Sequence, residues 1–167
     1  YTETDLVDPG YDKAVSVTAY QAACVSRLTN VTEEDFTKEN GLRDYTADLD
    51  IIDAYFSPAR NFMTLSVTIP FSDTSAKHTV KLVRNLSKDS KYKEHYVQDD
   101  YLWLEAYHDA GDDGAVLQAS THLCVKIDEE KLGIGKLQTF YKGIKIIYPS
   151  YQNDSAVKVF TLEFSQQ

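Results

Sequence analysis

The sequence lacks long hydrophobic runs and clusters of basic charge. No apolar stretch approaches the roughly 20 residues that a helix needs to cross a bilayer, and the longest ones, such as residues 144–148, have the length of a strand. The 17 basic residues are scattered and are outnumbered by 26 acidic ones, which gives a net charge of −9. Nucleic acids and anionic membranes attract clustered Lys and Arg. We therefore expect no membrane insertion and no nucleic-acid partner.

Motifs for catalysis, metal binding and cofactor binding are also lacking. The four histidines, His78, His95, His108 and His122, show no zinc-site spacing, and neither C-x-x-C nor H-E-x-x-H occurs. The sequence contains no G-x-S-x-G nucleophile motif, no phosphate-binding loop and no dinucleotide fingerprint. We predict a non-enzymatic protein without catalytic residues, bound metal or cofactor.

Cysteine is scarce, which permits a single disulfide bond. Cys24 and Cys124 form an even pair. N-x-S/T sequons begin at Asn30, Asn85 and Asn153, at expected helix starts, turns or strand ends, where a glycan is tolerated. Both features favour a secreted, extracellular glycoprotein. A cytosolic chain with two free thiols is the alternative.

The chain, residues 1–167, is expected to form one domain with a helical part before a β part. Residues 1–10 are acidic, end in Pro-Gly and predict an extended lead-in. Residues 12–41 predict a helical segment, in which Thr32 caps a short helix over 33–40 and Gly41 ends it. Residues 12–28 combine helical spacing with strand alternation, so helix and edge strand both remain open there.

Residues 46–165 show the pattern of β-strands. Met63, Leu65, Val67 and Ile69 alternate with Thr and Ser, a two-residue period typical of a strand with one buried face. Eight strands are expected, at residues 49–56, 63–69, 78–84, 92–97, 101–107, 116–127, 137–148 and 157–164. Short connections favour antiparallel hairpins, which would close into an eight-stranded barrel or fold into a sandwich. The order of elements resembles a lipocalin-like meander, which we favour, although the glycine-x-tryptophan of that family is absent.

The strand at residues 101–107 carries the predicted ligand-binding residues. Tyr101, Trp103, Glu105 and Tyr107 occupy alternate positions and would share one face. Aromatic faces hold cations, and a carboxylate among them could neutralise an amine. The intervening residues 102, 104 and 106 are apolar, so both faces of the strand should be covered. One alternative is that Tyr101 and Trp103 only pack while Glu105 turns to solvent, and another is a neutral or acidic ligand.

Two functions from different classes fit these features. In the first, a secreted barrel carries or sequesters a small hydrophobic or amine ligand. In the second, an extracellular β-sandwich binds another protein in adhesion or immune interaction, since its 12 tyrosines offer contact area and hydrogen bonds. Ser66, Glu105 and Thr121 would place polar groups inside a barrel, so we favour the first.

Overall fold

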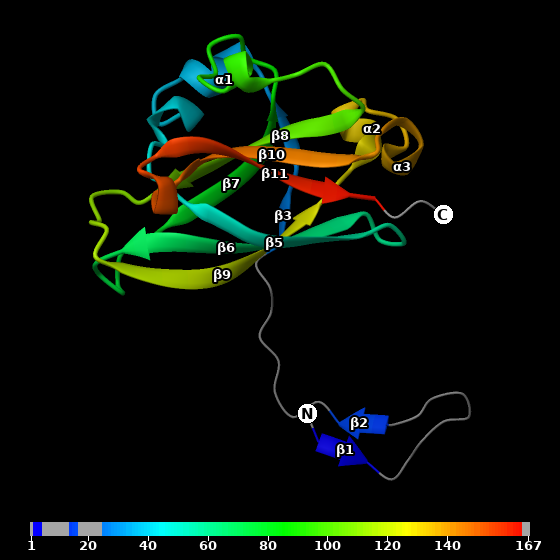
Figure 1. Cartoon of the computed structure of the whole chain (residues 1–167), viewed down its shortest axis with the longest axis horizontal. Helices are drawn as coiled ribbons and strands as arrows, with labels where there is room; N and C mark the ends of the chain where they lie inside the picture. The colour runs from blue at the N-terminus through cyan, green and yellow to red at the C-terminus, as the bar shows by residue number, and fades with distance from the viewer. Residues whose placement is uncertain (1, 5–13, 17–24, 165–167) are drawn as a thin grey trace.

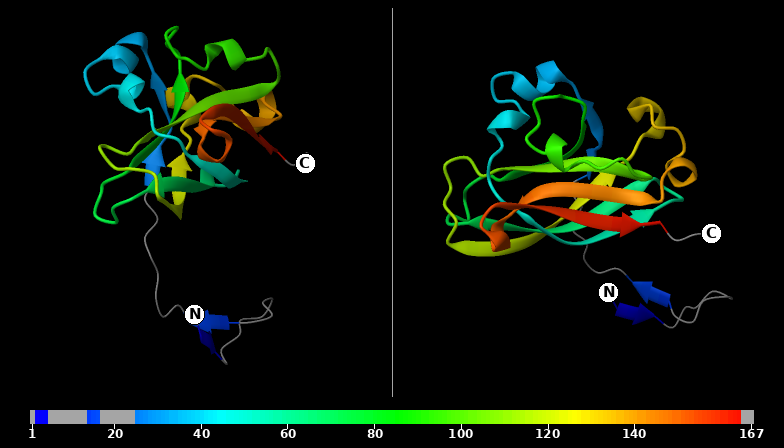
Figure 2. Two further views of the ribbon diagram at one scale, coloured as in Figure 1. Left: turned by 60° about the vertical axis from the view of Figure 1, so that its left-hand side comes forward. Right: turned by 45° about the horizontal axis from the view of Figure 1, so that its top comes forward.

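Two β-sheets stack face to face in the computed structural model, which describes residues 2–4, 14–16 and 25–164 (Figure 1, Figure 2). The five-stranded sheet has the order β11 (Ala156–Glu163), β10 (Gly143–Ser150), β8 (Tyr101–Asp109), β7 (Thr79–Asn85) and β4 (Thr29–Val31). The four-stranded sheet has the order β3 (Val25–Arg27), β9 (Leu117–Lys126), β6 (Phe62–Phe71) and β5 (Asp50–Ser57). Strands β1 (Thr2–Thr4) and β2 (Ala14–Ser16) pair with each other.

Short helical segments connect these strands. They are α1 (Glu33–Thr37), α2 (Glu129–Leu132) and α3 (Leu137–Phe140), with 3₁₀ turns η1 (Leu42–Asp44), η2 (Lys93–His95) and η3 (Tyr151–Asn153). Helix α1 lies over the outer face of the five-stranded sheet, and α2 and α3 lie together near one end of the sandwich (Figure 1). No helix in the described ranges is long and apolar enough to span a bilayer.

Alternating side chains fill the space between the sheets. On β6, Met63, Leu65 and Val67 point inward and are fully buried, as their two-residue period predicts. On β8, Leu102 and Leu104 face them from the other sheet within the same cluster. The main core is therefore the dry interior of a sandwich.

A second apolar cluster covers the outer face of the five-stranded sheet. Phe36 of α1, Leu42 of η1 and Tyr92 before η2 pack there against Tyr107 of β8 and Ile147 of β10. Strand β8 is thus covered on both faces, as the apolar residues on one face and the aromatic residues on the other indicate.

The closed barrel and the antiparallel meander are both wrong. Among residues 25–164 the strands form two separate sheets, and three of the strand pairs there are parallel: β8 with β10, β3 with β9, and β4 with β7. Between β8 and β10 the chain crosses to the other sheet as β9 and returns through α2 and α3, a connection long enough to make the two strands parallel. The sandwich alternative is the observed architecture.

Two expected strands contain helical turns instead. Within residues 92–97 lies η2, where the Ser90 hydroxyl accepts the Tyr92 amide and the His95 amide donates to the Tyr92 carbonyl. Residues 137–140 form α3, whose first amide donates to the Glu129 carboxylate at 2.6 Å, so β10 begins only at Gly143. Local polar partners therefore override the strand pattern at both places.

The expected helical segment at residues 12–41 is mostly wrong where it is described. Residues 14–16 and 25–27 are strands, as are 29–31, and residues 12–13 and 17–24 lie outside the described part of the chain. The short helix is confirmed: Thr32 caps α1 by accepting the Asp35 amide. It ends at Thr37, and the left-handed residue is Asn40, at φ 55°, rather than Gly41. Gly41 is needed because a Cβ there would lie 2.6 Å from two backbone oxygens.

Candidate functional site

Strand β8 places the four predicted ligand-binding residues on one face. Tyr101 and Trp103 are half-buried, while Glu105 and Tyr107 are buried. The expectation of a shared face is therefore correct, but Glu105 is 0% exposed. A carboxylate buried so deeply must be satisfied by the protein itself.

Four uncharged donors surround the Glu105 carboxylate. One oxygen, Oε2, accepts from Asn85 Nδ2 at 2.7 Å and from the Tyr107 hydroxyl. The other, Oε1, accepts from Ser90 Oγ at 2.8 Å and from the Tyr96 hydroxyl at 2.7 Å. Burial raises the pKa of both tyrosines, and the Glu105 charge raises it further, so both hydroxyls remain donors.

Lysines of the chain occupy the positions expected for an amine ligand. Lys93 Nζ lies 3.9 Å from Glu105 Oε1 and 4.5 Å from the centroid of the Tyr96 ring. Burial lowers the pKa of Lys93, although the Glu105 charge opposes this. Lys145 Nζ lies 4.5 Å from the Tyr101 ring centroid and 5.1 Å from that of Trp103. The carboxylate and the aromatic rings therefore do contact ammonium groups, but these groups belong to Lys93 and Lys145 of the same chain.

A surface hollow of about 300 Å³ adjoins this network. Tyr101 and Trp103 line it, but so do Arg84 and Lys93, whereas Glu105 does not. The positive charges of Arg84 and Lys93 would repel an ammonium group in this hollow. Ligand binding by these side chains remains a prediction, with an anionic or neutral ligand a better match than an amine.

The sequon asparagines have different environments. Asn85 is 2% exposed, and its amide nitrogen donates to Glu105 and Tyr107, so the folded chain has no room for a glycan there and that prediction is wrong. Asn30 is half-buried, with its amide nitrogen 3.2 Å from the Leu132 carbonyl oxygen. Asn153 is exposed in η3, and its glycosylation stays a prediction.

The predicted disulfide is not tested by the described residues. Cys124 is half-buried on β9 opposite Val25 of β3, and it has no disulfide partner within residues 25–164. Cys24, the residue before Val25, lies outside the described part of the chain.

A chain of polar groups that sequence patterns do not reveal joins two histidines. His108 Nδ1 donates to the Asp48 carbonyl at 2.7 Å, so its Nε2 accepts from His78 Nδ1 at 2.9 Å. His78 Nε2 lies 3.0 Å from Asp113 Oδ2. The three side chains form a line rather than converging on a point, and no group of three or more His, Cys, Asp or Glu suited to a metal occurs in the part of the chain that is described.

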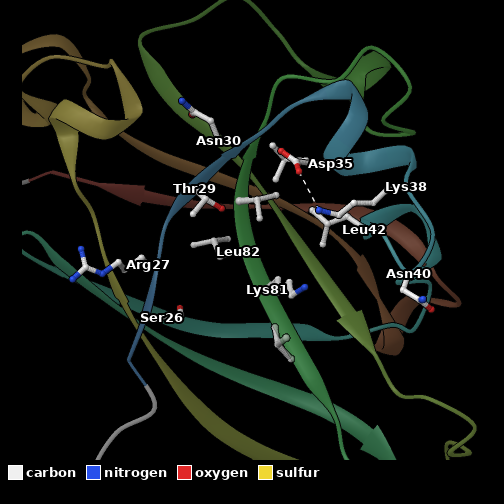
Figure 3. A pocket seen from close by; sticks show the side chains of 14 residues that line it. Ser26, Arg27, Thr29, Asn30, Asp35, Lys38, Asn40, Leu42, Lys81 and Leu82 are labelled. Atoms are coloured by element: carbon white, nitrogen blue, oxygen red, sulfur yellow. Dashed lines mark hydrogen bonds and ion pairs between the residues drawn. The ribbon is translucent and has the colours of Figure 1, made fainter.

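A groove of about 500 Å³ runs along the flank of the sandwich, where β4 leaves β7 (Figure 3). Its walls are the β3–β4 segment, the stretch from α1 to η1, and residues 80–83 of β7. The segment at residues 25–31 pairs first with β9 and then, after the buried Leu28, with β7 in the other sheet. The groove follows from this crossing, because β4 covers only one end of β7.

Backbone groups of β7 face the groove. Strand β4 pairs with Val83, Arg84 and Asn85, and no described strand pairs with residues 80–82 on that side. The Leu86 amide donates to the Val31 carbonyl, so even-numbered residues of β7 direct their backbone polar groups toward this side. No functional signal in the sequence marks this edge, since it depends on where β4 ends.

Basic side chains predominate in the groove lining. Arg27, Lys38 and Lys81 line it together with one acid, Asp35, which lies 3.1 Å from Lys38. The bond with Lys38 holds the pKa of Asp35 below its usual value. Arg27 and Lys81 are exposed, and neither forms an ion pair with a carboxylate among residues 25–164.

These features define a two-layer β-sandwich with a helical cap on one outer face and a basic groove at one flank. The NigD-like C-terminal beta sandwich domain matches residues 30–162, so the chain belongs to the NigD-like family. No curated protein matches it.

Three of the solved structures that resemble this chain come from Bacteroides species. A protein of unknown function from Bacteroides vulgatus is 14% identical, with a TM-score of 0.66 over 99% of this chain and 69% of that one. A NigD-like immunity protein from Bacteroides caccae is 16% identical, with a TM-score of 0.58 over 94% and 72%. A lipoprotein candidate from Bacteroides fragilis is 14% identical, with a TM-score of 0.55 over 84% and 70%. At these identities the likeness concerns the fold alone.

Proposed function

We propose that the chain is a non-enzymatic β-sandwich that works outside the cytoplasm and binds another protein through the groove between β4, β7 and α1. The supporting observation is the strand edge of β7, which borders a groove of about 500 Å³ with exposed basic side chains. Backbone groups at a sheet edge are ready to pair with another chain. The sequence also predicted protein binding as an alternative function, but through a surface rich in tyrosine. The proposal here places the binding site at a strand edge instead.

The carrier hypothesis has less support. A closed barrel is not the fold, and the site expected to hold an amine contains Lys93 and Lys145 of the chain itself. The side chains between the two sheets form one buried apolar cluster.

Names of similar proteins agree with this location and class. One is described as an immunity protein and another as a lipoprotein candidate. At such low identity these names support the proposal without establishing it.

Site-specific photo-crosslinking tests the proposal. A photoreactive amino acid at Lys81, an exposed residue lining the groove, should give a discrete protein adduct in the native host. The matched control is Arg60, which is equally exposed but lies at the turn between β5 and β6. Adducts at neither position, or the same adducts at both, would contradict binding through the groove.

Native mass spectrometry distinguishes the protein-binding proposal from the carrier hypothesis. The purified chain should show its bare mass before and after denaturation. A small molecule released on denaturation would instead favour the carrier and direct attention to the hollow beside Trp103.

A further inference from the structure

We infer that the partner contributes an extended acidic segment, which adds as a strand to β7 beside Val80 and Leu82 and places carboxylates near Arg27 and Lys81. The inference rests on the proposed function and specifies the chemistry of the partner at the same groove. Figure 3 shows Lys81 and Leu82 near the centre of the groove, with Arg27 toward one end and Lys38 and Asn40 toward the other.

The backbone of β7 supplies the first step. Parallel pairing of Thr29 with Val83 uses the Leu82 carbonyl, which accepts the Thr29 amide. The Leu82 amide and both polar groups of Val80 point the same way, toward the groove, without a strand partner in the described ranges. An extended segment placed beyond Thr29 would meet three backbone groups in register.

Side-chain alternation supplies the second step. Val80 and Leu82 turn inward and pack on the main core, whereas Lys81 and Val83 lie on the outer face of the sheet. An added strand would follow the same pleat, with alternate residues directed inward beside Leu82 and outward beside Lys81. The inward positions suit apolar side chains, and the outward positions suit charged ones.

Charge supplies the third step. The chain as a whole carries −9, yet the groove lining holds three basic side chains and one acidic one. The acidic residue, Asp35, is already paired with Lys38. Arg27 and Lys81 are exposed and pair with no carboxylate among residues 25–164, although Lys81 Nζ lies 4.6 Å from the centroid of the Tyr45 ring. An acidic segment is therefore attracted to the groove itself, while the remaining negative surface disfavours docking elsewhere.

Synthetic peptides test the inference directly. The probe is an eight-residue peptide of alternating Glu and Val with a terminal fluorophore, titrated with the full chain at low ionic strength by fluorescence anisotropy. Saturable binding is expected, with weaker binding of the Lys–Val peptide. The Glu–Val peptide with alternate backbone nitrogens methylated should lose binding, because it cannot complete the backbone bonds.

Two double variants with the same net charge locate the site. Arg27→Glu with Lys81→Glu should weaken Glu–Val binding by at least about tenfold. Arg60→Glu with Lys136→Glu changes two exposed bases away from the groove and should weaken it by less than about threefold, the contribution of net charge alone. Circular dichroism confirms that each variant is folded.

Several outcomes would overturn the inference. They are equal weakening by the two double variants, equal or tighter binding of the Lys–Val peptide, undiminished binding of the methylated peptide, and no saturation. Concentration-dependent dimers that dissociate in the groove variant would make a second copy of the chain the occupant instead. If crosslinking at Lys81 captures a protein while the peptide tests fail, the proposed function stands and the acidic-strand inference falls.

Discussion

Glu105 shows how a side chain suited to a ligand site can serve the fold instead. Its position between aromatic residues on β8 matches an amine-binding pattern, but Asn85, Ser90, Tyr96 and Tyr107 donate to it. These donors come from the end of β7, from both sides of η2 and from β8 itself. The carboxylate therefore fixes that loop against the sheet, and the whole group depends on one negative charge.

Replacing this carboxylate is expected to destabilise the fold strongly. Glu105→Gln puts an NH₂ group where only donors point, leaves Lys93 without its carboxylate and should cost about 3–5 kcal/mol of unfolding free energy. Urea unfolding measures the loss. Glu163→Gln is the control, since exposed Glu163 also accepts from a tyrosine, Tyr101 at 2.6 Å, and should cost less than about 1 kcal/mol. Equal costs would show that burial of the charge is unimportant.

The buried imidazole of His108 predicts a loss of stability in acid. Burial lowers its pKa below about 6.5, the ordinary pKa of histidine, and its Nε2 must stay unprotonated to accept from His78. As pH falls through 6.5, His108 becomes protonated in the unfolded chain but stays neutral in the folded chain. The free energy of unfolding therefore decreases from pH 7.5 to 5.5. The hydrogen bond from the Ser72 amide is the main cause of the lowered pKa of Asp113. Asp113 therefore adds a further loss of stability as pH falls below about 4, the ordinary pKa of aspartate.

Two histidine variants isolate this effect. His108→Gln should be less stable at neutral pH and should flatten the slope of stability between pH 7.5 and 5.5. His122→Gln should keep the slope, because His122 is exposed on β9 with a single bond to Ser66. Thermal unfolding at several pH values measures both, and an unchanged slope in the His108 variant would contradict the assignment.

At the scale of elements, β10 has no space for a side chain at its first residue. It lies between parallel β8 and antiparallel β11, and it begins at Gly143. A Cβ at Gly143 would lie 2.1 Å from the Leu162 carbonyl oxygen of β11. The two backbones approach so closely there that only glycine fits.

Two glycine variants separate a clash from backbone strain. Gly143→Ala should cost at least about 2 kcal/mol, because β10 and β11 must separate. Gly133→Ala should cost about 1 kcal/mol, because Gly133 ends α2 at φ 63° with no atom within 4 Å of an added Cβ. Denaturant unfolding ranks the two, and a Gly133 variant that is the less stable would contradict this reading.

At the scale of the whole molecule, one short segment pairs with both sheets in succession. Residues 25–27 pair with β9 and residues 29–31 pair with β7, with Leu28 buried between them. This crossing closes one flank of the sandwich at one end and leaves the groove at the other.

The predicted Cys24–Cys124 disulfide would attach the chain before this crossing to the four-stranded sheet. Closing a loop of about 100 residues stabilises by up to ~4.7 kcal/mol in the chain-entropy model. Oxidised protein should resist alkylation at both cysteines, and a reductant should lower its Tm. Cys124→Ser should remove the response to the reductant. Alkylation of both thiols in unreduced, folded protein would contradict the bond.

Local sequence determined much of this protein. The alternation of Met63, Leu65 and Val67 set the inward face of β6, and Thr32 set the start of α1. The doubly apolar pattern around Trp103 gave β8 its burial on both faces. Each of these depends on residues within a few positions, which is why sequence alone reveals them.

Tertiary structure decided the rest. Contacts between distant parts of the chain decide three features. They are the choice of sandwich over barrel, the place where β4 leaves β7, and the set of side chains that hydrogen-bond to Glu105. Asn85 and Glu105 are 20 residues apart and His108 and Asp48 are 60 apart, so no local period relates them. A strand pattern states which face is buried, but the partner strand is chosen by the packing of the whole core, and the groove exists only once that choice is made.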